Sequence, residues 1–122
     1  MISVWLAVGA ICCALSIVAG AFGAHGLEAR LDADSLALWE TAARYLMYGG
    51  LGLCLLGIVI HGHDRAGFVW AAVLLLAGTL IFSVTIFVLA LGGPRWLGAV
   101  TPIGGLGMIL GFVLFAWAAL RH

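Results

Sequence analysis

Long apolar runs separated by short polar breaks set the pattern of this chain. The runs extend over about 2–24, 36–60, 67–91 and 102–120. A helix needs about 20 residues to cross the hydrocarbon core of a bilayer, so each run is long enough to span it. Because the breaks are short, successive helices should be antiparallel neighbours. The pattern predicts an all-α membrane protein, an antiparallel four-transmembrane-helix bundle in a single domain over 1–122.

The polar breaks carry signals for helix ends. HGLEARLDADS (25–35) places Asp34 or Ser35 where a side chain can cap the second helix. GGPRWLGAVTP (92–102) holds both prolines of the chain. Its Thr101–Pro102 pair fits a cap followed by the first helical residue, where proline is tolerated. We therefore expect the fourth helix to begin at Pro102.

Small residues recur along each run at helical spacing. In lipid, close packing rather than apolar burial drives helix association, and small side chains permit it. In the first run the intervals are 4, 3, 4 and 3 residues, the period of a left-handed bundle. The residues expected to pack are Gly9, Cys13, Ser16, Gly20 and Gly23, then Gly50, Cys54 and Gly57, then Ala71, Gly78 and Thr85, and finally Gly104, Gly107, Gly111 and Ala118. The same faces could instead mediate homo-oligomerisation, and both readings stay open.

The composition agrees with lipid as the solvent. Hydrophobic residues make up 66% of the 122 positions and charged residues 8%, with a mean hydropathy of +1.28. A soluble domain has about 45–50% apolar and about 25% charged residues. The formal net charge is zero, which gives no reason to expect nucleic acid as a partner. The expected partners are the lipid bilayer and, through the small-residue faces, a second copy or a larger membrane complex.

Ionisable side chains near a membrane span are functional candidates, because charge in lipid is costly. Glu40 and Arg44 have the spacing of a helical ion pair. An antiparallel hairpin would bring His25 towards them, with its ring facing the second helix and the Glu40 carboxylate shared. The candidate polar cluster comprises His25, Glu40, Arg44, Tyr45, Tyr48 and Arg95. It either titrates or binds an anionic head group, or it is only an interfacial ion pair, a helix-end histidine and an aromatic belt.

Other reactive residues give weaker signals. Cys12, Cys13 and Cys54 lie inside apolar runs without a CxxC spacing, which is typical of packing residues rather than a disulfide or metal site. HGHDRAG (61–67) could hold a metal, but such a stretch is more often a solvated turn, and no further ligand is evident. We expect no metal and no cofactor. No nucleotide-binding or hydrolase motif occurs, which disfavours an enzyme.

Two functions remain open. The first is a non-enzymatic scaffold or accessory membrane subunit, favoured by the small-residue faces. The alternative is a small transporter or channel with a polar entrance at His25, Glu40 and Arg44, which a water-filled cavity reaching past Arg44 would favour. Arginine is distributed almost evenly between the two ends of the bundle, so the positive-inside rule distinguishes them only weakly. The small difference favours an orientation with both termini in the cytoplasm.

Four motifs resemble a known family. They are GAFGAHGL (20–27), WETAARYLMY (39–48), LIFSVTIFVLAL (80–91) and RWLGAVTPIGGLGMILG (95–111). They resemble the domain of unknown function 423 family, also called uncharacterised protein family 0382, to which mitochondrial transmembrane protein 256 is similar. The resemblance implies a four-helix protein of the bacterial inner membrane without an established activity. In the second motif the family has Gln, Gln and His where this chain has Glu40, Leu46 and Gly49.

Overall fold

The computed structural model describes residues 4–63 and 66–121, and within them it contains four long helices and one short helical turn. The first helix is α1 (Val4–Phe22), which continues into the π-helical turn η1 (Gly23–Leu27). The others are α2 (Ala33–Gly62), α3 (Ala66–Ala90) and α4 (Leu97–Leu120). All four long helices are apolar and long enough to cross a membrane. The expectation of an all-α membrane fold is therefore confirmed.

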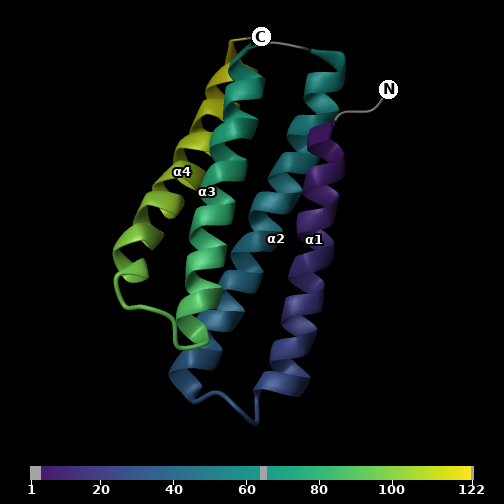
Figure 1. Cartoon of the computed structure of the whole chain (residues 1–122). Coiled ribbons are helices and arrows are strands. Elements are labelled where there is room, and N and C mark those ends of the chain that lie inside the picture. The colour runs from purple at the N-terminus through teal and green to yellow at the C-terminus, as the bar shows by residue number, and fades with distance from the viewer. Residues whose placement is uncertain (1–3, 64–65, 122) are drawn as a thin grey trace.

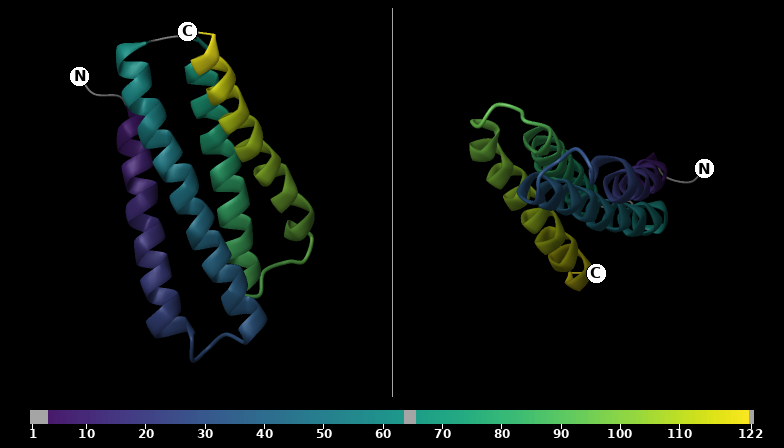
Figure 2. Two further views of the ribbon diagram at one scale, coloured as in Figure 1. Left: turned by 180° about the vertical axis from the view of Figure 1, so that it is seen from behind. Right: turned by 90° about the horizontal axis from the view of Figure 1, so that it is seen from below.

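The helices stand side by side in the order in which they occur in the chain, with neighbours antiparallel (Figures 1 and 2). The close-packed pairs are α1 with α2, α2 with α3, and α3 with α4, while α2 touches α4 only slightly. Within their most apolar stretches, 44% of the residues of α2 and 39% of those of α3 are buried, against 17% for α1 and 22% for α4. The bundle is thus an open row whose core lies along α2 and α3.

Glycines bring the backbones of two helix pairs together. A Cβ added at Gly9 of α1 would lie 2.6 Å from the backbone N of Cys54 in α2. One added at Gly78 of α3 would lie 2.5 Å from the backbone N of Met108 in α4. Lipid offers no hydrophobic drive for helix association, so this close approach is what holds the pairs together.

Gly20 departs from the predicted packing face, and the prediction is wrong there. A Cβ added at Gly20 meets no atom of the described residues within 4 Å. The ribbons of α1 and α2 diverge towards the α1–α2 loop (Figure 1), so their backbones no longer touch at this level. At Gly23, farther along, the widened space is filled by the indole of Trp39, which lies 2.7 Å from the added Cβ.

The second helix begins earlier than expected. Asp32, not Asp34 or Ser35, is the cap of α2, and its side chain accepts a 2.8 Å hydrogen bond from the backbone N–H of Ser35. This bond satisfies one of the free N–H groups of the first turn. It also lowers the pKa of the Asp32 carboxyl below its ordinary value, because it stabilises the charged form.

The fourth helix also begins earlier, at Leu97, so the expected start at Pro102 is wrong. Thr101 does not cap the helix. Its hydroxyl donates to the Leu97 carbonyl at 3.0 Å and lies 2.6 Å from the hydroxyl of Thr85 in α3. Pro102 therefore sits inside the second turn of α4, where its missing N–H removes one backbone bond.

Candidate functional site

Two of the sequence motifs meet where α1 ends. The indole N–H of Trp39, in α2, donates a 2.7 Å hydrogen bond to the carbonyl of Ala19 in α1. Ala19 lies in the last turn of α1, just before the helix continues into η1. Gly23 leaves the space in which the indole ring lies. The GAFGAHGL motif (20–27) and the WETAARYLMY motif (39–48) are therefore in direct contact, because Trp39 of the second packs on Gly23 of the first.

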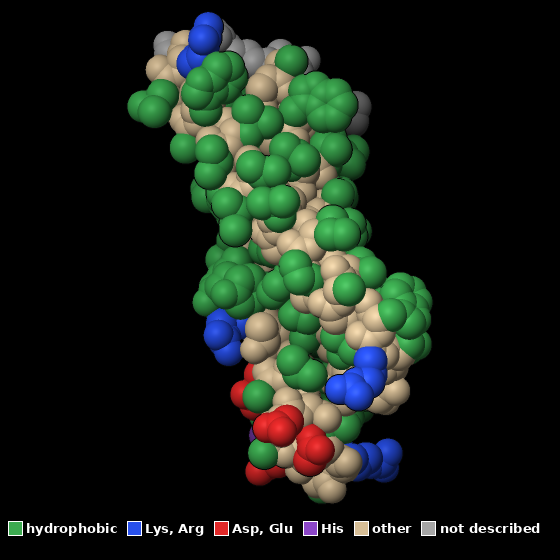
Figure 3. All heavy atoms as spheres, turned by 90° about the vertical axis from the view of Figure 1, so that its left-hand side faces the viewer, with side chains coloured by type: hydrophobic (Ala, Val, Ile, Leu, Met, Phe, Trp, Pro, Cys, Tyr) green, Lys and Arg blue, Asp and Glu red, His purple; other side chains and the backbone are tan. Residues whose placement is uncertain are grey.

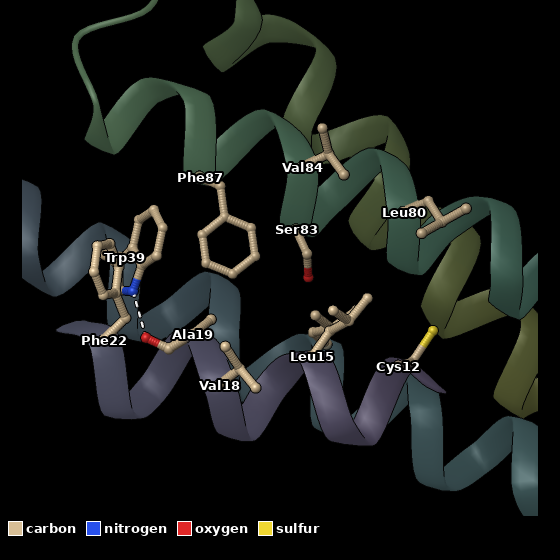
Figure 4. Close-up of a pocket in the computed structure, with 11 residues that line it drawn as sticks. Cys12, Leu15, Val18, Ala19, Phe22, Trp39, Leu80, Ser83, Val84 and Phe87 are labelled. Carbon is tan, nitrogen blue, oxygen red and sulfur yellow. Dashed lines mark hydrogen bonds between the residues drawn. The ribbon is translucent and has the colours of Figure 1, made fainter. Parts of the chain in front are cut away.

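An aromatic cluster surrounds this contact. The Trp39 ring meets the edge of Phe87 in α3 with centroids 4.5 Å apart, and it lies 6.3 Å from the ring of Phe22. A Cβ added at Gly26 would lie 3.1 Å from the Phe22 ring, so the third glycine of the motif makes room for that side chain. Through Trp39 the cluster ties α1, α2 and α3 together at one end of the molecule (Figure 4).

An apolar groove of about 420 Å³ runs from this cluster along the molecule, between α1 and α3 and across α2 (Figure 4). Ser83 brings a hydroxyl to it, but that hydroxyl donates a 3.0 Å hydrogen bond to the Ala42 carbonyl. The lining residues are Cys12, Leu15, Val18, Ala19, Phe22, Trp39, Leu46, Leu80, Ser83, Val84 and Phe87. Such a lining suits hydrocarbon rather than water.

A second groove, of about 530 Å³, lies between α2 and α4. Its lining residues are Tyr45, Tyr48, Phe82, Gly105, Met108, Ile109 and Phe112. The Tyr45 ring contacts both the Tyr48 ring, at 5.0 Å, and the Phe82 ring, at 4.8 Å. With about 3.6 residues per turn, the tyrosines project from a different side of α2 than Trp39 and Leu46. The two grooves therefore open on opposite faces of the α2–α3 pair.

The candidate polar cluster shares one end of the molecule, because η1, the start of α2 and the α3–α4 loop all lie there (Figure 1). Charged side chains gather at this end, below a broad apolar surface (Figure 3). His25, Glu40, Arg44 and Arg95 are all exposed. Within the described part of the chain, none of the four side chains forms an ion pair or a hydrogen bond. The expected sharing of the Glu40 carboxylate is thus not seen, and the residues form a charged rim.

Serine hydroxyls hold α2 from both sides. Ser16 of α1 donates to the Ala43 carbonyl at 2.6 Å, and Ser83 of α3 donates to the adjacent Ala42 carbonyl. Hydrogen bonds of this kind cross between helices in lipid, where water cannot compete for them. They fix α2 at one level between its two neighbours.

Gly49 has a structural complement in α3. The side chain of Thr79 occupies the space into which a Cβ at Gly49 would project. Thr79 is fully buried, and its hydroxyl has no hydrogen-bond partner among the described residues. The histidine implied at this position by the family resemblance would have no room beside Thr79.

The HGHDRAG stretch gives no assembled metal site among the residues described. His61 and His63 are exposed at the end of α2, and Asp64 lies outside the described residues. No group of three or more His, Cys, Asp or Glu side chains in the described ranges is placed to hold a metal.

Comparison with known proteins finds a family and several bacterial relatives that resemble this chain. The family described as protein of unknown function (DUF423) matches residues 19–105. UPF0382 membrane protein SH2409 of Staphylococcus haemolyticus is 46% identical over 110 residues, covering 90% of this chain and 89% of the relative. SERP0230 of Staphylococcus epidermidis is 42% identical over 118 residues (97% and 96%), and YwdK of Bacillus subtilis is 35% identical over 120 residues (98% of both). No solved structure matches the chain.

Proposed function

The chain belongs to the DUF423 family, and we propose that it is a non-enzymatic accessory subunit of the bacterial inner membrane that packs against a larger membrane complex. Its relatives are named membrane proteins of bacteria, which supports the location. The observation that carries the proposal is the outward face of α1.

This face carries small residues at regular spacing. Ala7, Ala10, Ala14 and Ala21 are all exposed, and they follow one another by 3, 4 and 7 residues. That is the period of a helix seam in a left-handed bundle. Small side chains let a second helix approach closely in lipid. We therefore assign this alanine face to a transmembrane helix of the partner complex.

The opposite side of α1 supports the same reading. There Gly9 and Ser16 use close approach and an interhelical hydrogen bond to hold α2. The helix is thus equipped for helix contacts on two sides, and α2 occupies one of them. The grooves are lined almost wholly by apolar side chains, so the transporter alternative gains no supporting observation from them.

Affinity purification from native membranes tests the proposal. The tagged wild-type chain should co-purify in fixed proportion with a defined membrane complex identified by mass spectrometry. The double variant Ala10→Leu/Ala14→Leu should lose that complex, because the added bulk keeps the partner helix away. The matched control is Ala116→Leu, also exposed but on α4, which should retain it.

Two results would count against this function. One is a complex that survives the double variant as well as it survives the control. The other is recovery of only a second copy of the chain, shown with two different tags, which would make the alanine face a homo-oligomer contact. Size-exclusion chromatography of each variant in detergent shows whether it remains folded.

A further inference from the structure

Two cysteines face each other in the close contact between α1 and α2. A Cβ added at Gly50 of α2 would lie 2.9 Å from the sulfur of Cys13. A Cβ added at Gly9 of α1 would lie 2.9 Å from the sulfur of Cys54. Each thiol therefore lies beside a glycine of the opposite helix. Because glycine has no side chain, nothing at these positions keeps the two thiols apart.

Helix geometry points both sulfurs towards the same level. Cys13 follows Gly9 by one turn in α1, and Cys54 follows Gly50 by one turn in α2. Side chains on a helix lean towards its N-terminus. Because the helices are antiparallel, the two cysteines lean towards each other. In the reduced state the Cys54 thiol donates a 3.8 Å hydrogen bond to the Leu6 carbonyl of α1.

The third cysteine is placed differently. Cys12 lines the groove between α1 and α3, about 100° around α1 from its neighbour. All three thiols are free in the structure. The arrangement thus contains one interhelical pair and one separate thiol.

We propose that Cys13 and Cys54 are a latent redox pair, which a lipid-soluble two-electron oxidant converts into a disulfide that joins α1 to α2. Both S–H bonds break and one S–S bond forms. Two protons and two electrons pass to the oxidant: an azodicarboxamide takes them up to become the hydrazine. A disulfide needs Cα atoms within about 7 Å, and the contacts at Gly9 and Gly50 let the backbones come close. The bond would tie α1 covalently to α2, against which it packs closely.

The test uses the whole chain in membrane vesicles. After treatment with a membrane-permeant azodicarboxamide, the protein is denatured, alkylated with N-ethylmaleimide and weighed by mass spectrometry. The expected chain is lighter by two hydrogens and carries one maleimide, on Cys12, instead of three. Trypsin cleavage after Arg30, in the exposed α1–α2 loop, should then leave fragment 1–30 attached to the fragment that carries Cys54 until a reductant is added.

Single serine variants assign the bond. Cys12→Ser should still form the link, whereas Cys13→Ser and Cys54→Ser should not and should alkylate at both remaining thiols. The oxidised wild type should also unfold at a higher temperature than its reduced form, with no such shift in Cys54→Ser. The proposal is overturned if oxidised wild type keeps three reactive thiols, if the link runs through Cys12, or if it joins two chains.

Discussion

Replacing Gly78 with alanine should destabilise the protein, whereas the same replacement at Gly20 should not. At Gly78 the new Cβ would lie 2.5 Å from the backbone N of Met108 and 2.7 Å from the carbonyl oxygen of Gly104. Both are backbone atoms of α4, so neither can rotate away, and the helix itself must shift. At Gly20 the new methyl meets no described atom within 4 Å.

The size of the effect follows from the distances. Ordinary van der Waals contact begins at 3.4 Å, so α3 and α4 would have to separate by about 1 Å around Gly78. A gap of roughly 0.5–1 Å removes a quarter to a half of a contact's attraction. Overpacking of this kind typically destabilises by about 1–3 kcal/mol. Alanine regains up to about 1 kcal/mol in helix propensity at either site, so this gain cancels when the two variants are compared.

The assay is reversible unfolding in mixed micelles, with rising sodium dodecyl sulfate and tryptophan fluorescence as the signal. Gly78→Ala should be less stable than Gly20→Ala by about 1–3 kcal/mol in free energy of unfolding. Gly20→Ala should match or slightly exceed the wild type. Equal stability of the two variants would show that the glycine contact between α3 and α4 does not hold the row together.

Further outcomes follow from the hydrogen bonds and the topology. Trp39→Phe keeps an aromatic ring but removes the bond to α1, and it should reduce the free energy of unfolding in the same micelles by about 1 kcal/mol. Ser83→Ala should reduce it by about 0.6 kcal/mol, the average for an interhelical bond in lipid. The Asp32 cap contributes its full stabilisation of the folded state above the ordinary carboxyl pKa of 3.8, and this stabilisation is lost as the pH falls through the lowered pKa. Asp32→Ala should therefore weaken the fall of the melting temperature at acid pH. A reporter fused to the C-terminus should be active in the cytoplasm, and activity confined to the outer side would reverse the predicted orientation.

The spans were predictable from sequence because hydropathy is summed over a whole membrane thickness. Their ends were not, because single hydrogen bonds decide them. The cap at Asp32 depends on the bond from Ser35, and α4 begins early because the N–H groups of Leu97 and Gly98 bond to the Pro94 and Arg95 carbonyls. Composition reveals neither set of bonds.

The candidate site was predictable only in part. Sequence placed His25 and Glu40 at one end of the molecule, which follows from the antiparallel order of the helices. It did not predict the docking of Trp39 on Gly23, because residue spacing within one helix does not show which side chain of a neighbouring helix fills the space beside a glycine. A signal was present in the sequence. A glycine near the end of one apolar run leaves space beside its helix, and a tryptophan near the start of the next run has a ring large enough to fill that space.

The open row also bears on how the protein is made. Each close-packed helix pair is consecutive in the chain, so no contact has to wait for the first helix to find the last. Contacts between segments that are near in sequence form quickly, because little chain entropy is lost in closing them. As the ribosome delivers each helix to the bilayer, its partner is the one inserted just before it. The α1–α2 hairpin already holds the bonds of Ser16 and Trp39 before α3 is synthesised, so assembly can proceed by adding one interface at a time.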